Sequence, residues 1–415
     1  MRIALIHGKY FNSWEALGLA YIASFLRKHK PEIEFIFFQG CFDSEETIAK
    51  ESAKSDIICF SCTTPTFPWL VRVGEAIKMI NPKARIVVGG YHPSAVPSEC
   101  LKFKAIDQVV VGEGESAMLD IVNGNTDKIV LGKMLNFSEL FWPDRKLIRN
   151  ERNIQVAYND NKKRITSFQG HRGCPFKCCY CADGNRIMCG KQKLVIRHRD
   201  VSDLLNEMEY VTKEFNLDLL KFCDATWNIS IKWIIDFCKE KIERKFNIPF
   251  YPNIHPGVCS EEMFVAMAEA NCFEIAIGVE SGSEKILKQI GKGTNRESIR
   301  RCVNLAKKAR LKIRGYFILG MPEEDENDIS ETEKFAEELD LNEYGFTILC
   351  PWPGTQMYHP KTYANINWEK TDEYSNDFWR TKYLTNEQLK KWQKRLTERF
   401  SNRLTWHNEA LQKKK

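Results

Sequence analysis

Apolar, β-branched runs alternate with amphipathic stretches from the first residues of the chain. Strands are predicted at residues 2–7, 33–38, 56–61, 85–90 and 107–111, and helices near 15–28, 45–53 and 69–80. This alternation is typical of a parallel sheet whose strands are joined by helical crossovers. Residues 1–135 are therefore predicted to form a five-stranded, doubly wound, flavodoxin-like domain.

A second series of alternating elements follows. Its strands are predicted near residues 164–170, 218–224, 249–254, 274–280, 312–319 and 343–350, and its helices near 200–215, 230–245, 260–270, 295–309 and 325–339. Six strands in this rhythm predict a partial (β/α)6 barrel at residues 164–360, short of a closed eight-stranded one. The fold class is α/β.

Two segments lie outside these series. Residues 136–163 are predicted to be a linker, because the periodicity lapses there and Pro143 and Asp144 interrupt it. Residues 361–415 are predicted to form a short helical extension, in which Thr385 and Gln388 form a capping box. The apolar stripe that follows, from Leu389 to Leu404, is expected to pack on the barrel.

Composition narrows the function classes. The formal charge of +6, from 61 basic and 55 acidic residues, is interspersed and too weak to indicate nucleic-acid binding. No stretch approaches the roughly 20 apolar residues of a membrane span, so we expect a cytoplasmic protein. Without a secretory signal, the fifteen cysteines are expected to be thiols or metal ligands rather than disulfides.

Three of those cysteines follow the first barrel strand with a characteristic spacing, Cys174-x3-Cys178-x2-Cys181. Three thiolates would leave one iron of a [4Fe–4S] cluster without a protein ligand, and a substrate can chelate that iron. The alternative is zinc, with Cys179 or Cys189 as the fourth ligand. Structural zinc sites usually pair their cysteines in two separated knuckles, which disfavours zinc here.

With its aromatic Tyr180 before the third cysteine, this loop resembles the motif of the radical S-adenosylmethionine (SAM) superfamily. The resemblance implies a [4Fe–4S] cluster on Cys174, Cys178 and Cys181, with Tyr180 against the adenine of SAM. Cys179 has no role in this motif. Reductive cleavage of SAM would yield methionine and a 5′-deoxyadenosyl radical.

Chemistry in parallel barrels lies at the carboxyl ends of the strands, and these ends supply further candidates. By the same resemblance, Asp224 in FCDATWN could accept a hydrogen bond from the SAM amine, although a helix N-cap is as good an interpretation. Glu280 and Ser281 in GVESGS, and Gly320 in GYFILGMPEED, are expected near SAM. His255 is either structural or catalytic.

The first domain resembles the cobalamin-binding domain of class B radical SAM enzymes, through VVGGYHP at 87–93 and VVVGEGE at 109–115. The chain lacks the D-x-H-x-x-G motif that supplies a cobalt-ligating histidine, so cobalamin is expected base-off, without a protein histidine ligand. Some relatives keep the domain without the cofactor. The candidate cobalamin-binding residues are Gly8, Ser61, Thr63, Thr64, Phe67, Trp69, Gly89, Gly90, His92, Gly112, Glu113 and Gly114.

The loop at residues 64–69 follows the third predicted strand and contains two bulky aromatic residues, Phe67 and Trp69. We predict that one of them covers the lower face of cobalamin. The alternative is that both aromatic residues belong to the core.

These resemblances together imply a cobalamin-dependent radical SAM methyltransferase acting on an unactivated carbon. The deoxyadenosyl radical would remove a hydrogen from the substrate, which would take a methyl group from methylcobalamin. The alternatives are a radical cyclisation, rearrangement or oxidation without methyl transfer, and a non-catalytic sensor. The expected partners are an external one-electron reductant such as flavodoxin or ferredoxin, and a substrate that is a small molecule, a lipid or a peptide side chain.

Overall fold

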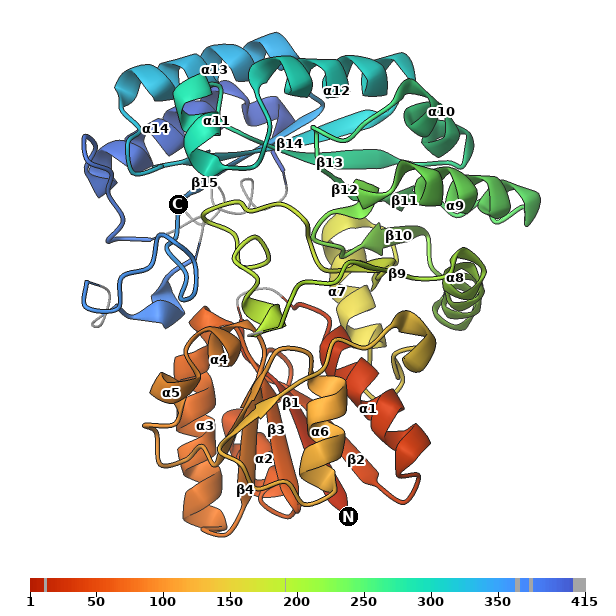
Figure 1. Ribbon diagram of the computed structural model, residues 1–415, viewed down its shortest axis with the longest axis vertical. Helices are drawn as coiled ribbons and strands as arrows, with labels where there is room; N and C mark the ends of the chain where they lie inside the picture. Colours follow the sequence, from red (N-terminus) through yellow and green to blue (C-terminus); the bar gives the residue numbers. More distant parts are fainter. Residues whose placement is uncertain (11–12, 191, 363–365, 373–375, 406–415) are drawn as a thin grey trace.

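The computed structural model describes residues 1–10, 13–190, 192–362, 366–372 and 376–405. Two α/β units lie one above the other, with the N-terminal domain below a partial barrel (Figure 1). The predicted fold class is confirmed.

The N-terminal domain is built on a six-stranded parallel sheet of order β2-β1-β3-β4-β5-β6. Its strands are β1 Arg2–His7, β2 Glu34–Gln39, β3 Ile57–Ser61, β4 Arg85–Gly89, β5 Gln108–Val111 and β6 Ile129–Leu131. The sequence predicted five of them. The sixth, β6, is a run of three apolar residues of which only Val130 is buried, and this run is too short to be distinguished as a strand in the sequence.

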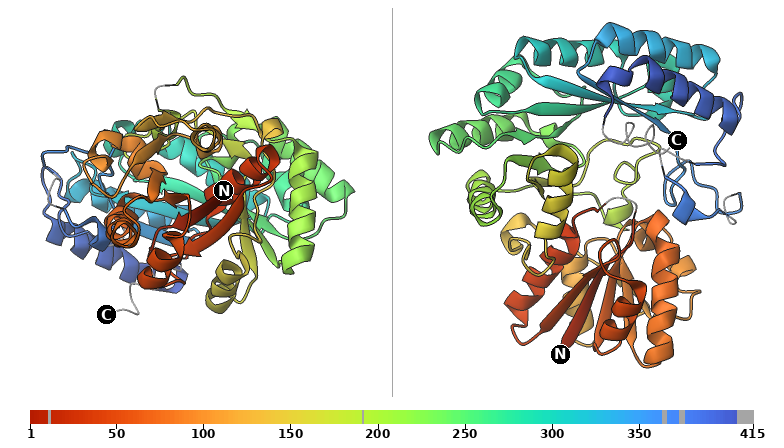
Figure 2. Two further views of the ribbon diagram at one scale, coloured as in Figure 1. Left: turned by 90° about the horizontal axis from the view of Figure 1, so that it is seen from below. Right: turned by 180° about the vertical axis from the view of Figure 1, so that it is seen from behind.

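Helices cover both faces of this sheet (Figure 2). Residues of α1 Leu17–His29 and α6 Gly114–Val122 share one hydrophobic core with the odd-numbered positions of β1, Ile3 and Leu5. Residues of α2 Glu45–Ser52 and α3 Phe67–Ile80 share the other with the even-numbered Ala4 and Ile6. Two short helices, α4 Tyr91–Ala95 and α5 Pro97–Cys100, follow β4.

The partial barrel follows the predicted order of strands. They are β7 Ile165–Phe168, β10 Leu219–Phe222, β11 Phe250–Tyr251, β12 Asn253–Ile254, β13 Glu274–Glu280, β14 Lys312–Leu319 and β15 Glu343–Ile348. The strand predicted at 249–254 is divided at Pro252: β11 pairs with β10, and β12 pairs with β13. Proline has no N–H to donate, which interrupts the ladder at this point.

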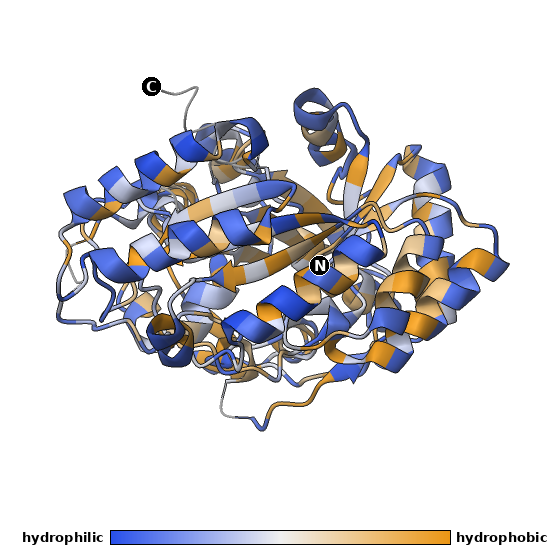
Figure 3. Ribbon diagram, turned by 90° about the horizontal axis from the view of Figure 1, so that it is seen from above, coloured by the Kyte–Doolittle hydropathy of each residue, from blue (hydrophilic) through white to orange (hydrophobic). Residues whose placement is uncertain are grey.

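Helices cover the outside of the barrel with their hydrophilic residues outward, above mostly hydrophobic strands (Figure 3). Five of them match the predicted ones: α8 Val201–Phe215, α9 Ile231–Glu243, α10 Glu261–Glu269, α12 Arg296–Lys308 and α13 Glu326–Leu339. A further helix, α11 Glu284–Ile290, has seven residues and was not predicted.

The segment predicted to be a linker contains a helix, α7 Glu151–Asn161. Within α7, Asn153 and Ile154 are the buried residues, so the helix shows no hydrophobic stripe in the sequence. In the C-terminal segment, α14 Asn386–Arg399 begins at the predicted capping box of Thr385 and Gln388, and Leu389 and Leu396 are buried. Residues 406–415 lie outside the described residues. Within the described part, no helix combines the length and apolar character needed to cross a bilayer.

Candidate functional site

The cysteine loop begins directly after β7. A short strand, β8 His171–Arg172, pairs antiparallel with β9 Arg197–His198 before the first motif cysteine. Cys174 and Cys178 are buried and Cys181 is half-buried. Burial raises the pKa of Cys178 to about 12, and the other two thiols of the motif also act on this group, which places the three side chains in one neighbourhood.

An asparagine that the sequence analysis did not single out organises this loop. The Asn185 side-chain amide donates to the carbonyls of Cys178 at 3.2 Å, Cys179 at 3.1 Å and Cys181 at 2.7 Å. The Cys179 amide donates to the Ile290 carbonyl at 3.0 Å, which ties the loop to the end of α11. The backbone around the thiols is therefore held independently of any metal.

The zinc alternative receives no support from the arrangement. Within the described ranges, no group of three or more His, Cys, Asp or Glu side chains converges on a position for one metal ion. The thiolates of a cubane cluster each bind a different iron, so they need not converge in this way.

Glu280 lies beside the cysteine loop at the end of β13, where the register shifts between Gly278 and Glu280. It has φ +66°, a left-handed backbone conformation that few residues other than glycine adopt. Its carboxylate accepts from the Lys292 ammonium at 2.6 Å, and Lys292 also donates to the Gly278 carbonyl at 2.7 Å. Burial and the negative charge of Glu280 raise the pKa of Tyr180, so these side chains are neighbours.

The polar groups of the other predicted SAM residues form hydrogen bonds within the protein. Asp224 accepts from the backbone N–H groups of Gly170, at 3.0 Å, and His171, and burial raises its pKa to about 7. It is not a helix N-cap, because Thr226 precedes the next 3-10 turn. The Ser281 hydroxyl lies 3.0 Å from that of Thr332.

Gly320 has φ +95°, and its carbonyl accepts from the Trp379 indole N–H at 2.6 Å. The side chains of Asp224 and Ser281 already bond to other residues of the protein. Either one could bind SAM only by sharing or breaking those hydrogen bonds.

His255 is a packed side chain. Its ring stacks on Phe176 with centroids 3.5 Å apart, and Nε2 lies 3.1 Å from the Lys292 carbonyl. Burial lowers the pKa of His255 to about 4, so it is neutral. These contacts favour the structural interpretation.

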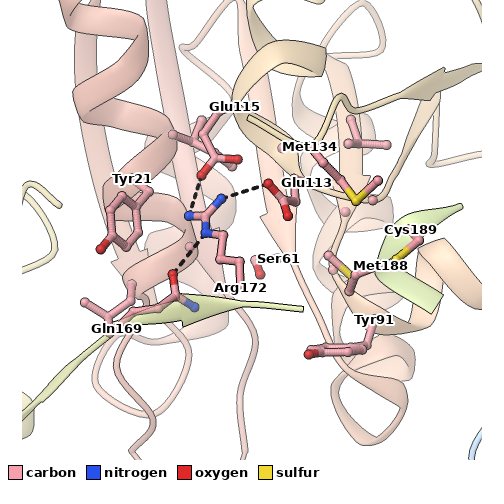
Figure 4. A pocket seen from close by; sticks show the side chains of 18 of the residues that line it. Tyr21, Ser61, Tyr91, Glu113, Glu115, Met134, Gln169, Arg172, Met188 and Cys189 are labelled. Carbon is pink, nitrogen blue, oxygen red and sulfur yellow. Dashed lines mark hydrogen bonds and ion pairs between the residues drawn. The ribbon is translucent and has the colours of Figure 1, made fainter. Parts of the chain in front are cut away.

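A cavity of about 350 Å³ joins the two domains. It runs from the carboxyl ends of β3, β4 and β5 to Cys174 and Arg172 of the cysteine loop. Six of the predicted cobalamin residues line it: Ser61, Gly89, Gly90, Gly112, Glu113 and Gly114. Figure 4 shows Arg172 among Glu113, Glu115 and Gln169 and close to Ser61, with Met134, Met188 and Tyr91 on the other side of the view.

Two positions in the wall of this cavity require glycine. Gly90 has φ +103°, and a Cβ there would meet the Cys62 carbonyl oxygen at 2.5 Å. Gly112 has φ +90°, and a Cβ there would lie 3.0 Å from the Met188 carbonyl oxygen. Doubly wound sheets bind ligands beyond the carboxyl ends of their strands, so a cavity lined by glycine backbone at this place fits a bound cofactor.

The remaining predicted cobalamin residues do not line this cavity: Gly8, Thr63, Thr64, Phe67, Trp69 and His92. The expected loop at 64–69 is instead a 3-10 turn, Thr64–Thr66, followed by α3, which begins at Phe67. Trp69 is 1% exposed within the domain core. This corrects the expectation for Trp69, and the alternative of core packing accounts for its position.

The residues around Trp69 bond mainly with one another. Phe67 packs on His92 with ring centroids 4.3 Å apart, and the His92 Nδ1 lies 3.1 Å from the Thr64 hydroxyl. The Thr63 N–H donates to the Thr66 hydroxyl at 3.0 Å. A Cβ at Gly8 would meet the Thr66 Cβ at 2.7 Å, so Gly8 allows close packing within the domain.

Glu113 forms ion pairs with two arginines, and the sequence did not predict these contacts. Its carboxylate lies 3.0 Å from an Arg172 Nη and 2.8 Å from an Arg197 Nη, while Arg172 also contacts Glu115 at 2.8 Å (Figure 4). All four side chains are at most 12% exposed. The VVVGEGE segment of the first domain is therefore bonded to the residue two positions before Cys174.

A second contact joins the same two segments. The Tyr91 hydroxyl of the VVGGYHP segment donates at 3.0 Å to Asp183, two residues after Cys181. Burial raises the pKa of both groups. The cysteine loop thus contacts the first domain on each side of its three cysteines.

Comparison with known families agrees with both domains. Residues 3–122 match the B12 binding domain, and residues 169–336 match the radical SAM superfamily. The barrel is therefore a radical SAM domain, and a B12-binding domain precedes it.

Individual relatives span most of the chain. An uncharacterized methyltransferase of Pyrococcus horikoshii is 29% identical over 90% of this chain and 85% of the relative. An anaerobic magnesium-protoporphyrin IX monomethyl ester cyclase of Rubrivivax gelatinosus is 25% identical over 86% of this chain and 69% of the relative.

A solved structure shares the fold. It is the radical SAM methyltransferase TsrM from Kitasatospora setae with cobalamin and a [4Fe–4S] cluster bound. It superposes with a TM-score of 0.69 at 14% identity, and the match covers 86% of this chain and 76% of that one.

Proposed function

We propose that this chain is a cobalamin-dependent radical SAM methyltransferase that methylates an unactivated carbon. The observation that carries the proposal is the cavity, since one space connects the glycine-lined strand ends of the B12-binding domain with Cys174. In this proposal residues 1–135 carry base-off cobalamin, and residues 164–360 carry the cluster and SAM. When bound, these groups would supply the radical and the methyl group.

The protein's own contribution is to hold and orient these groups. Cys174, Cys178 and Cys181 bind the cluster on a loop whose carbonyls are bonded to Asn185. Tyr180 and Glu280 lie beside those cysteines and are the side chains we assign to SAM. We assign the supply of the electron to an external reductant such as flavodoxin or ferredoxin.

The proposal can be tested without the substrate by measuring transfer of a labelled methyl group from SAM to cobalamin. Anaerobically reconstituted protein, loaded with cobalamin and reduced, is incubated with methyl-labelled SAM. We expect label in the cobalamin fraction and S-adenosylhomocysteine in solution. Formation of 5′-deoxyadenosine without S-adenosylhomocysteine would favour the alternative reaction, a radical cyclisation or oxidation, to which the similarity with the Rubrivivax cyclase lends weight.

Gly89 offers a variant that separates the two cofactors. Gly89→Leu should fill the slot, so that iron content stays normal while cobalamin uptake is lost. The matched control is Gly89→Ala, whose methyl group would meet the Val110 Cβ at 3.5 Å, an ordinary contact distance. Full cobalamin uptake by the Leu variant would show that the cofactor does not occupy this cavity.

A further inference from the structure

Lys292 is a buried ammonium beside the proposed cluster and SAM site. It lies in the connection between α11 and α12, and its side chain is 10% exposed. It contacts two oxygens, Glu280 Oε1 at 2.6 Å and the Gly278 carbonyl at 2.7 Å. The Glu280 side chain is 6% exposed, so the pair is almost fully removed from water.

The space for this pair is made by Gly278. An ideal Cβ at that position would lie within 3.0 Å of both the Glu280 carboxylate and the Lys292 ammonium, so it would collide with them. The group that approaches the Gly278 backbone is therefore the protein's own lysine.

Lys292 lies beside the cysteine loop. Two residues before it, the Ile290 carbonyl accepts from the Cys179 N–H at 3.0 Å, and an ideal Cβ at Gly291 would lie 3.4 Å from the Lys177 carbonyl oxygen. Tyr180 of the same loop adjoins Glu280. The Lys292–Glu280 pair therefore lies next to the segment between the first and third motif cysteines.

Burying the Lys292–Glu280 pair at the end of β13 carries a desolvation cost for both charges, and this cost can exceed the gain from their mutual attraction. At a site that holds a cluster, such a pair has an additional effect. A fixed positive charge stabilises the reduced, more negative state of the cluster, and net charge near a cluster is one of the factors that set its reduction potential.

We propose that Lys292 is a positioning residue of the cluster and SAM site: it fixes the Glu280 carboxylate in the orientation that meets SAM and supplies a positive charge that raises the cluster's reduction potential. This inference rests on the proposed function, since it requires a cluster on the three cysteines. Lys292 itself is assigned no contact with the reacting atoms.

The test is a charge series on anaerobically reconstituted protein without substrate. Iron content, the midpoint potential of the cluster by redox titration with electron paramagnetic resonance, and SAM affinity are measured for Lys292→Met, Glu280→Gln, the double variant and Lys292→Arg. The control is Lys288→Met, which removes an exposed lysine of the neighbouring helix α11.

We expect Lys292→Met to lower the potential and Glu280→Gln to raise it, with the double variant close to wild type because its net charge is unchanged. SAM should bind roughly tenfold more weakly to Lys292→Met, the loss expected for one charge-assisted hydrogen bond made by a misplaced Glu280. Lys292→Arg should restore most of both properties, and Lys288→Met should alter neither.

The outcomes are decisive. If Lys292→Met keeps its iron and has the wild-type potential and SAM affinity, the inference is wrong. If Lys292→Met fails to fold because Glu280 is left unpaired, the double variant decides, since equal potentials for it and Glu280→Gln would also refute the inference. Failure of the wild-type protein to take up iron would instead refute the proposed function.

Discussion

Glu113→Ala should loosen the contact between the two domains, because it removes the carboxylate shared by two buried arginines. Arg172 would keep Glu115 at 2.8 Å and Gln169 at 3.0 Å. Arg197 would keep the Leu135 carbonyl at 2.8 Å, and its Nε already has no partner in the described structure. The cost therefore falls mainly on Arg197, whose side chain is 4% exposed.

Breaking a buried ion pair by removing one partner costs about 3–5 kcal/mol. Glu113 lines the cavity, so water can reach the freed guanidinium, and we expect the lower end, a loss of about 3 kcal/mol in unfolding free energy. Urea unfolding followed by tryptophan fluorescence measures it. The control, Glu99→Ala, breaks an exposed pair with Lys102 and should cost under about 1 kcal/mol.

A second variant checks the cause. Replacing Arg197 by Met in the Glu113→Ala background removes the unpaired charge, so the double variant should be more stable than the sum of the two single changes implies. A loss below about 1 kcal/mol for Glu113→Ala, or strictly additive effects, would refute the role assigned to this pair.

Three further predictions concern single residues. Cys174→Ala should abolish iron uptake, whereas Cys179→Ala should retain it. Iron content and 5′-deoxyadenosine formation measure both effects. Loss of the cluster in the Cys179 variant alone would overturn the ligand assignment. Asp224→Asn should leave SAM affinity unchanged, since backbone N–H groups already occupy the carboxylate. The pKa of Asp224 is raised from 3.8 to about 7 in the folded protein. The free energy of unfolding of the wild type, relative to that of Asp224→Asn, should therefore fall as the pH rises from about 4 to 7 and stay level above pH 7. Parallel pH profiles for the two proteins would contradict the raised pKa. Trp69→Ala should cost about 3–5 kcal/mol in unfolding free energy, as for a core aromatic residue, and leave the cob(II)alamin spectrum unaltered; a changed spectrum in a stable variant would restore Trp69 to the cobalt.

The sequence predicted the larger elements because their hydrophobic patterns are strong. Strand β3 is a continuous apolar run, and α12 places Ile299, Cys302 and Val303 on one buried face. Among the elements that were missed, β6, α7 and α11 are short or mostly polar and are stabilised by neighbours that the sequence does not show. Tertiary packing decides such segments, and local pattern does not.

The site divides in the same way. The spacing of the three cysteines can be read directly, since the chemistry requires three thiolates within one loop. The Glu113–Arg172 pair joins residues 59 positions apart, and no local pattern in either segment predicts that the two side chains meet. Trp69 shows a different limit: an aromatic residue after a strand can face a ligand or a core, and only the position of α3 decides between them.

The bond between Trp379 and the Gly320 carbonyl sets an order of events during synthesis. The partners are 59 residues apart, and ribosomes add about 5–20 residues per second. The loop after β14 therefore remains without its indole donor for roughly 3–12 seconds after Gly320 has been translated. Cys174 and its two companions are made earlier still. During this interval the nascent chain already carries its three motif thiols while the Trp379–Gly320 contact is still missing, so the cysteine loop exists before the loop after β14 is fixed in place.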